Sequence, residues 1–257
     1  MTVESRDIDG GVRILTLNNP PANAFSRALL TDLGAAADAA KNDDRVRAVV
    51  VTGAGKFFSG GLDLKEVTAP SPGEVFGSSF GRNDGVFALW TLPKPTVAMV
   101  NGHAIAGGAI LCLACDVRIV ARGEAKIGLN EVAIGLSFPI GAYEIAALAL
   151  NNQQARRVLL EAGLHAPDTA RTLGMIDEVV EPADLERVCI ERARRLASYS
   201  AAAYAHTKRT LQHDAVQRVL SETEEQRRAT AKLWSSAEVQ AIVKQQLARL
   251  TTKKSTV

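Results

Sequence analysis

Short apolar runs alternate with amphipathic segments over the first part of the chain. The run VRILTLNNP, residues 12–20, predicts a strand that ends at a Pro-Pro turn. Residues 27–44 carry apolar side chains at helical spacing, and Ser26 can cap this helix. Three further β-branched runs lack polar alternation, as in strands buried on both faces: residues 46–55, 94–102 and 117–121. Strands separated by helical segments predict an α/β core with crossover connections.

Beyond Asn151 the pattern is helical throughout. Apolar positions recur at helical spacing in residues 151–163, 184–200, 202–212, 224–234 and 237–250. The last two segments have amphipathic faces and little that would keep them stable in isolation. We therefore expect them to dock onto the core or onto another subunit, and the sequence leaves both arrangements open.

Residues 66–85 (EVTAPSPGEVFGSSFGRNDG) interrupt this pattern with a segment rich in Pro, Gly and Ser. A stretch of this length without regular structure is uncommon in a compact domain. It is typical of a lid or a binding loop. A surface loop without a binding role fits equally well, so both interpretations stand.

Composition and charge narrow the class of protein. The 257 residues are 47% hydrophobic and 23% charged, which suits a globular domain with a substantial core. The net charge of +2 provides no field that would attract nucleic acid. No apolar run is long enough to cross a bilayer, and the N-terminus has acidic residues and no apolar signal segment. We therefore expect a cytoplasmic protein that binds neither membranes nor nucleic acid.

Cysteine and histidine usage argues against a disulfide framework and against a metal site. The three cysteines fit a reducing compartment. Cys112 and Cys115 form a C-x-x-C with apolar flanks and no second ligand pair, so we predict a buried helical face there. The four histidines show no ligand spacing.

Standard catalytic and nucleotide-binding motifs are missing. GAGKFF lacks the third glycine of a dinucleotide fingerprint and the Ser or Thr of a phosphate loop, and there is no G-x-S-x-G. Two glycine-marked turns remain, at residues 56–66 and within 100–116, where a helix should start directly after a strand. N–H groups at a helix start lack an internal partner. Gly107 has no side chain that would keep a ligand away from its N–H. Two such groups aimed at one oxygen would form an oxyanion hole.

Three segments carry a family resemblance: FFSGGLDLKE (57–66), NGHAIAGGAILCLACDVRI (101–119) and IGLNEVAIGL (127–136). In this order and at these separations, they resemble the crotonase family of enoyl-CoA hydratases and isomerases. The resemblance implies an acyl-CoA thioester substrate and no separate cofactor, since coenzyme A is part of the substrate. It also implies an α/β spiral of ββα units over residues 1–195. A C-terminal helical region, residues 196–257, would then form a trimer or a hexamer (a dimer of trimers).

The resemblance also assigns residues to a site. Leu62 and Gly107 match the positions whose N–H groups hold the thioester carbonyl in the family. The turn that would line the path of CoA and the thioester consists of Gly60, Gly61, Leu62, Asp63 and Leu64. Asn130, beside Glu131, is assigned to substrate binding as well.

The family's hydratases use two glutamates, and only the second is present here. Ile110 occupies the first position and Glu131 the second, while the Asp of dienoyl-CoA isomerases would fall at Pro139. A lone Glu with an apolar residue at the other position is similar to the mitochondrial-type Δ3,Δ2-enoyl-CoA isomerases of fatty acid β-oxidation. One carboxylate that reaches both C2 and C4 suffices for their reaction. Water addition by a hydratase and acyl-CoA binding without catalysis stay as alternatives.

Other polar residues near these segments have ordinary interpretations. His103 is predicted to be packed or hydrogen-bonded. The side chains of Asp63 and Asp116 are predicted to cap or to pair. Lys56 and Lys65 could meet CoA phosphates or simply be solvated.

Overall fold

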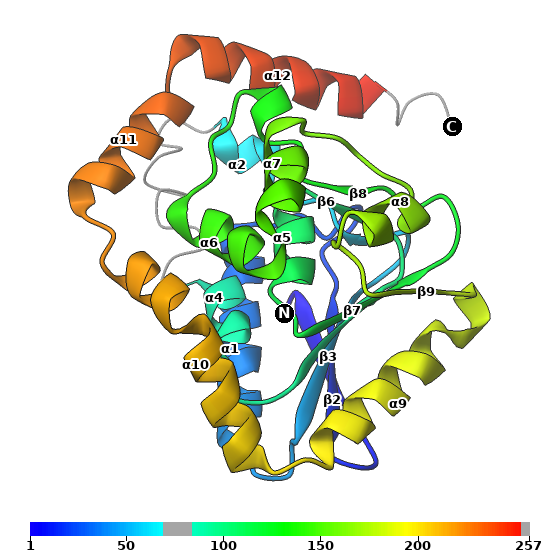
Figure 1. Cartoon of the computed structure of the whole chain (residues 1–257). Helices are drawn as coiled ribbons and strands as arrows, with labels where there is room; N and C mark the ends of the chain where they lie inside the picture. The colour runs from blue at the N-terminus through cyan, green and yellow to red at the C-terminus, as the bar shows by residue number, and fades with distance from the viewer. Residues whose placement is uncertain (69–83, 253–257) are drawn as a thin grey trace.

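The structure, a computed structural model, describes residues 1–68 and 84–252. Its main element is a six-stranded sheet in the order β1-β2-β3-β5-β7-β9 (Figure 1). The strands are β1 (Val3–Ile8), β2 (Val12–Leu17), β3 (Ala48–Gly53), β5 (Thr96–Val100), β7 (Val117–Ala121) and β9 (Glu178–Val180). β1 and β2 form an antiparallel hairpin, and all later neighbours are parallel. The predicted α/β core with crossover connections is confirmed.

A smaller parallel sheet consists of β4 (Phe57–Ser59), β6 (His103–Ile105) and β8 (Ile127–Gly128). Each of these short strands follows a strand of the large sheet, so the pairs β3–β4, β5–β6 and β7–β8 repeat one step. The helical segments after them are α2 (Leu64–Val67) with α4 (Gly85–Trp90), then α5 (Gly107–Leu113), then the 3-10 turn η1 (Val132–Ile134) with α6 (Ile140–Ala149). This is the repeated ββα unit that the resemblance implied.

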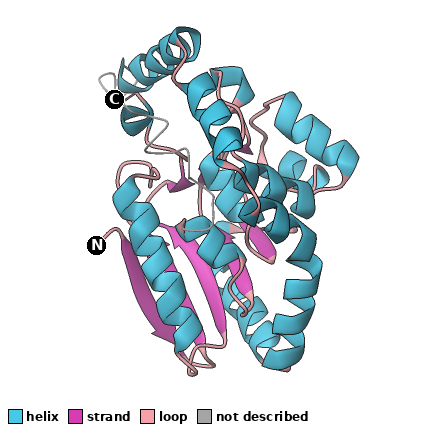
Figure 2. Cartoon of the chain, turned by 90° about the vertical axis from the view of Figure 1, so that its left-hand side faces the viewer, coloured by secondary structure: helices cyan, strands magenta, loops and turns pink. Residues whose placement is uncertain are grey.

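Helices cover both faces of the large sheet. α1 (Arg27–Asn42) lies across one face (Figure 2), and its N-terminus is capped by Ser26, as predicted. α9 (Leu185–Ala197), which follows the 3-10 turn η2 (Pro182–Asp184), covers the other face.

The strand β3 shows why the apolar runs lack polar alternation. Val49 and Val51 pack into the core shared with α1, whereas Ala48 and Val50 pack into the core shared with α9. All six residues of this strand are buried. A strand buried on both faces has no solvent side on which polar residues are needed.

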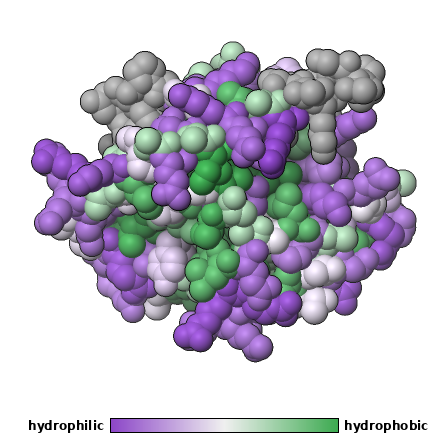
Figure 3. Space-filling model, turned by 90° about the horizontal axis from the view of Figure 1, so that it is seen from above, coloured by the Kyte–Doolittle hydropathy of each residue, from purple (hydrophilic) through white to green (hydrophobic). Residues whose placement is uncertain are grey.

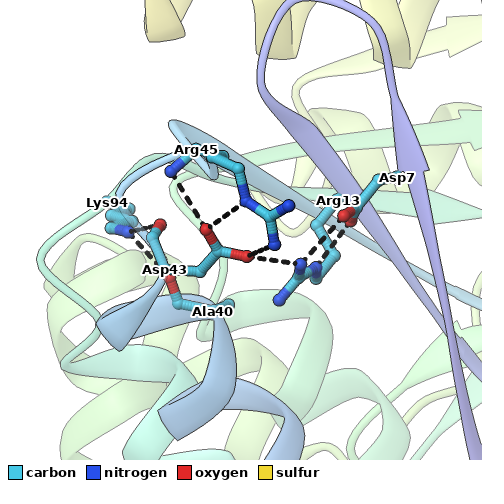
Figure 4. Close-up of polar contacts among 6 residues, drawn as sticks. All are labelled: Asp7, Arg13, Ala40, Asp43, Arg45 and Lys94. Atoms are coloured by element: carbon cyan, nitrogen blue, oxygen red, sulfur yellow. Dashed lines mark hydrogen bonds and ion pairs between the residues drawn. The ribbon is translucent and has the colours of Figure 1, made fainter.

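A charged cluster fixes the C-terminus of α1 at the amino ends of β2 and β3 (Figure 4). Lys94 Nζ donates to the carbonyl oxygens of Ala40 at 2.7 Å and of Asp43 at 2.9 Å. The Asp43 carboxylate accepts from Arg45 at 2.9 Å and from Arg13 at 3.0 Å. These hydrogen bonds, with those of Arg45 the stronger, hold the pKa of Asp43 well below its usual range. The cluster therefore stabilises the end of the sheet at which the parallel strands begin.

The helices α7 (Asn152–Leu160) and α8 (Pro167–Thr172) lead to β9, and α10 (Ala201–Leu220) then returns to the core. On α10, Lys208 Nζ pairs with Asp116 Oδ2 at 2.9 Å, and Gln212 Nε2 donates to the Trp90 carbonyl at 2.8 Å. Tyr204 Oη also donates to Asp116, at 3.0 Å. The prediction that Asp116 pairs is confirmed, and the pairing attaches α10 to the large sheet.

The last two helices, α11 (Glu224–Trp234) and α12 (Ala237–Thr252), dock onto their own chain. Their apolar side chains form a cluster with α2 and with the segment around η1: Val67, Leu136, Trp234, Val239 and Val243. Trp234 Nε1 donates to the Ser137 carbonyl at 3.1 Å. On the face seen from above in Figure 3, hydrophilic side chains surround hydrophobic ones that gather toward the middle. Of the two arrangements left open by the sequence, docking onto the core is present; a role in trimer formation stays a prediction.

The expectation of helix throughout the chain beyond Asn151 is wrong at β9. This strand extends the large sheet by pairing with β7. At its start, Asp177 N donates to the Arg118 carbonyl at 2.9 Å, and the two side chains form an ion pair at 2.6 Å. Three residues are too few to show a period in the sequence, and the strand forms because β7 offers backbone groups that need a partner.

The segment rich in Pro, Gly and Ser falls largely at residues 69–83, which lie outside the described residues, so its predicted role stays open. Its described ends belong to α2 and to the N-cap of α4, where Asp84 accepts from Val86 N at 2.7 Å. Among the described helices, none is both long and apolar enough to span a bilayer.

Candidate active site

The two glycine-marked turns meet in space. Gly61 has a left-handed backbone with φ of 80°, and a Cβ added to it would lie 2.8 Å from the backbone nitrogen of Gly107. The same atom would lie 2.8 Å from the Ile105 carbonyl oxygen. A side chain at this position would therefore push the turns apart, so Gly61 is what allows the backbone after β4 to reach the backbone after β6.

The first turn is held by two side chains that sequence analysis missed, Asn23 and Ser59. Asn23, which is fully buried with φ of 49°, donates from Nδ2 to the carbonyls of Ala54 at 3.0 Å and Phe57 at 2.8 Å. Ser59 Oγ donates to the Asn23 carbonyl at 2.8 Å and accepts from Gly61 N at 3.1 Å. Asn23 lies outside the three segments of the resemblance, and Ser59 lies within residues 57–66 without a role assigned to it, because their partners are brought together only by the fold.

The N–H of Leu62 is left without an acceptor by this arrangement. Leu62 forms an isolated parallel bridge with Phe25, in which Phe25 N donates to Gly61 O at 2.7 Å and Asp63 N donates to Phe25 O at 3.1 Å. The hydrogen bonds thus use the groups on either side of Leu62. Among the described residues, none accepts a hydrogen bond from the Leu62 N–H.

The second turn enters α5 through a strained residue. Ala106 has φ of 52° and ψ of −125°, a combination tolerated mainly by glycine, and such strain costs about 1–3 kcal/mol. Its N–H donates to the Gly128 carbonyl at 2.8 Å, and its own carbonyl accepts from Ala109 N at 2.8 Å. Gly107 is the first residue of α5, and no acceptor for its N–H lies within the described part of the chain.

Glu131 provides a buried carboxyl group with one oxygen that has no partner among the described residues. It directly precedes η1, its side chain is only 7% exposed, and its Oε2 has no hydrogen-bond partner among residues 1–68 and 84–252. Burial raises the pKa of this carboxyl to about 8. The neighbouring Asn130 likewise has a buried side-chain oxygen with no partner within the described residues. A buried carboxyl oxygen without a hydrogen-bond partner is costly to folding and is typical of a functional group.

The positions at which relatives would place further acids are apolar here. Ile110 is fully buried in the core, one turn into α5. Pro139 is the N-cap residue of α6, and Phe138 packs partly buried against the same core. Of the three positions that the resemblance compared, only the one at Glu131 carries an acid.

The C-terminal helices α11 and α12 pack against residues of the first turn and of the segment that follows Glu131. Leu62, Leu64 and Ile134 pack, partly buried, against the cluster formed by α11 and α12. Gln240 Nε2 donates to the Val67 carbonyl at 3.2 Å. The turn that carries the Leu62 amide and the turn that follows Glu131 are therefore both braced by the end of the same chain.

The remaining predicted residues have structural roles. Asp63 caps α2 by accepting from Lys65 N at 2.9 Å, as predicted for its side chain. His103 Nδ1 accepts from Lys126 N at 3.0 Å and its ring packs on Phe57, which confirms the packed and hydrogen-bonded interpretation. Lys56 and Lys65 are exposed.

The C-x-x-C also has the structural role predicted for it. Cys112 and Cys115 are buried in and just after α5, and burial raises the pKa of the Cys112 thiol to about 12. This confirms a buried helical face. Over the described residues, no group of three or more His, Cys, Asp or Glu side chains is arranged to hold a metal ion.

Comparison with known proteins decides the family. The family model described as Enoyl-CoA hydratase/isomerase matches residues 7–254. The chain belongs to the enoyl-CoA hydratase/isomerase family. It therefore has the crotonase fold, in which two sheets are followed by a C-terminal helical region, and membership implies an acyl-CoA substrate. The fold and the family indicated by the three sequence segments are confirmed.

Individual members of the family carry different names. The short-chain-enoyl-CoA hydratase of Clostridium acetobutylicum is 32% identical over 207 residues, which is 79% of this chain and 78% of that protein. The "Probable enoyl-CoA hydratase" of Bacillus subtilis is 37% identical over 137 residues, which is 53% of each protein. The crystal structure of human mitochondrial delta3-delta2-enoyl-CoA isomerase is 25% identical, with a TM-score of 0.91 over 99% of this chain and 100% of that one.

Proposed function

We propose that this family member is a Δ3,Δ2-enoyl-CoA isomerase, which converts a 3-enoyl-CoA to a trans-2-enoyl-CoA with Glu131 as the acid–base group. One observation carries the proposal. The carboxyl of Glu131 is buried and its Oε2 has no hydrogen-bond partner among the described residues, while Ile110 stands where the family's hydratases have a second glutamate. One carboxyl group suits a proton transfer between two carbons of one substrate.

The reaction follows from this arrangement. The Glu131 carboxylate takes a proton from C2, and the electron pair of that C–H bond moves between C1 and C2 while the carbonyl π pair moves onto the thioester oxygen. In the dienolate that results, the C3–C4 double bond is conjugated with the new one. The carboxyl then returns the proton to C4, the double bond settles between C2 and C3, and the thioester carbonyl forms again.

The negative charge of the intermediate rests on the thioester oxygen, and Leu62 and Gly107 supply its donors. Their two N–H groups have no acceptor among the described residues, and their turns are in contact through Gly61. Each such donor contributes about 3–4 kcal/mol to transition-state stabilisation in a site that excludes water. Gly60, Asp63, Leu64 and Asn130 complete the proposed substrate contacts.

Burial of the carboxyl suits this role in a second way. A carboxyl with a pKa of about 8 is a stronger base than an exposed glutamate. The apolar Ile110 adds no group that would hold and activate a water molecule. The stronger base suits proton abstraction in either reaction, and the apolar Ile110 is the feature that favours double-bond migration over water addition.

Hydration is the second candidate, because the Clostridium acetobutylicum relative is named as an enoyl-CoA hydratase. The human mitochondrial isomerase, matched over the full length of both chains, supports our first choice. The deciding experiment supplies the enzyme with a 3-enoyl-CoA and with crotonyl-CoA, and compares the two values of kcat/KM. Faster migration than hydration supports the isomerase; faster hydration reverses the ranking. Binding of both without turnover would indicate an acyl-CoA-binding protein.

We also propose that residues 1–195 are the catalytic core and that residues 196–257 contribute to a trimer or hexamer. Because α11 and α12 are engaged with their own chain, α10 and its neighbour α6 are the better contact elements. Large apolar side chains are exposed on both, at Tyr143, Leu148, Leu211 and Leu220. Light scattering coupled to size-exclusion chromatography tests this assembly, and a monomer at micromolar concentration would contradict it.

A further inference from the structure

Ala106 keeps a backbone conformation that a glycine would adopt without strain, directly before the Gly107 amide. We infer that the Ala106 methyl group is a spacer that sets the distance between the Leu62 and Gly107 amides. This makes Ala106 a positioning residue, and the inference rests on the proposed function of those amides.

Ala106 is unusual even among the strained residues of the chain. Three non-glycine residues in the described part have positive φ: Asn23, Ala106 and Ala162. Asn23 has a residue type that tolerates such backbone and a side chain with several partners, and Ala162 follows the C-terminal end of α7, where left-handed residues are common. Ala106, with ψ of −125°, lies outside the left-handed helical region altogether.

The surrounding hydrogen bonds hold Ala106 in this conformation. Its N–H is tied to the Gly128 carbonyl at 2.8 Å, and its carbonyl accepts from Ala109 N at 2.8 Å and Ile110 N at 3.1 Å. Strained backbone of this kind persists where neighbouring structure determines it, and it gathers at functional sites. Glycine would relieve the strain and lose only the methyl group. The methyl group is therefore the feature that needs an explanation.

The methyl group of Ala106 faces the first turn. A Cβ added to Gly61 would lie 2.9 Å from the Cβ of Ala106, so the methyl carbon fills the space beside Gly61. Leu62, the next residue, carries the first amide. Without the methyl group, the turn at Gly61 gains room to move toward α5, and the two amides lose their fixed separation. Two donors act on one oxygen only when both lie at hydrogen-bond distance from it.

The test is the substitution Ala106→Gly, with Ala162→Gly as its matched control. Both replace a positive-φ alanine, each with φ of 52°, so both relieve strain, but only Ala106 contributes one of the three atoms nearest to a Cβ added at Gly61. For Ala106→Gly we expect kcat to fall roughly tenfold with KM nearly unchanged and the melting temperature not lowered. For Ala162→Gly we expect wild-type kcat. A purely structural alanine would give a more stable enzyme with unchanged kcat in both variants.

A second measurement does not depend on turnover. The infrared carbonyl stretch of octanoyl-CoA, labelled with carbon-13 at the thioester, reports hydrogen bonding to that oxygen. We expect a shift to lower frequency on binding to the wild type and a smaller shift with Ala106→Gly. Equal shifts together with equal kcat would overturn this inference alone. A wild type that binds octanoyl-CoA without any shift, or does not bind it, would overturn the proposed function along with it.

Discussion

Gly61 and Gly107 approach so closely that a methyl group on the first would lie 2.8 Å from the backbone nitrogen of the second. This contact joins the turn after β4 to the start of α5. Leu62, whose N–H has no acceptor among the described residues, directly follows Gly61 and is thereby brought to the start of α5, although Leu62 and Gly107 are far apart in sequence.

Replacing Gly61 with alanine should therefore separate the two amides. We expect kcat/KM to fall by about 100-fold or more, because misplacement by about 1 Å is sufficient for such a loss. Gly55→Ala is the matched control, since Gly55 also has positive φ, 72°, but has nothing within 4 Å of the added carbon. Steady-state kinetics on a 3-enoyl-CoA measures both variants. Equal losses would mean that strain, and not the contact with Gly107, is responsible.

Glu131→Gln should abolish turnover while acyl-CoA still binds. The amide is nearly the same size as the carboxyl but cannot take up a proton, so we expect a loss of about 10²–10⁴-fold in kcat. Calorimetric titration with a saturated acyl-CoA checks binding. Glu144→Gln is the control, because Glu144 is also buried but is paired with Arg218 at 2.7 Å. An active Glu131→Gln enzyme would show that another group is the base.

The value of kcat/KM should increase with pH. Glu131 must be ionised to take the C2 proton, and the pKa of its carboxyl is about 8. We expect kcat/KM to rise with pH and to reach half of its plateau near pH 8, as this parameter reports the free enzyme. A profile that is flat between pH 6 and pH 9 would be incompatible with a base of raised pKa.

The same group should make the protein less stable as the pH rises. The unfolded chain loses the Glu131 proton near the ordinary pKa of 4.5, whereas the folded chain holds it up to about pH 8. The contribution of Glu131 to the free energy of unfolding is therefore fully present below pH 4.5 and is lost as the pH rises toward 8. At about 1.4 kcal/mol per pH unit, and with titration incomplete at both ends of the range, roughly 3.5 kcal/mol is lost between pH 5 and pH 8.

Glu131→Gln removes this titration and provides the comparison. Its free energy of unfolding, measured with urea, should exceed that of the wild type at pH 8, and the difference should nearly vanish at pH 5. A difference that is the same at both pH values would indicate that the carboxyl is not protonated in the folded protein.

Much of the core was predictable from the sequence because a strand buried on both faces appears there as a continuous apolar run. The runs that became β3 and β5 contain no polar alternation and are buried throughout, and Ser26 marked the start of α1. The same expectation was too strong for β7, where only Ile119 and Val120 are fully buried. β9 escaped because its three residues form a strand only through the edge of β7. A short strand of this kind is decided by its neighbour and not by its own composition.

The candidate site was predictable only in part. Glycines and a glutamate stand in linear segments that resemble a family, so Gly61, Gly107 and Glu131 could be named from the sequence. Asn23, Ser59 and Ala106 could not, because their roles depend on partners that are brought close by the fold. The docking of α11 and α12 was undetermined for a related reason: an amphipathic face shows that a partner exists, but not which one.

The central claim is that one carboxyl group carries one proton from C2 to C4, and isotope transfer tests it most directly. A 3-enoyl-CoA with deuterium at C2 is converted in ordinary water under single-turnover conditions, and the product is analysed by NMR. Because the Glu131 carboxyl is buried, we predict that deuterium appears at C4 of the trans-2-enoyl-CoA. A product whose new hydrogen at C4 comes entirely from water would contradict the account.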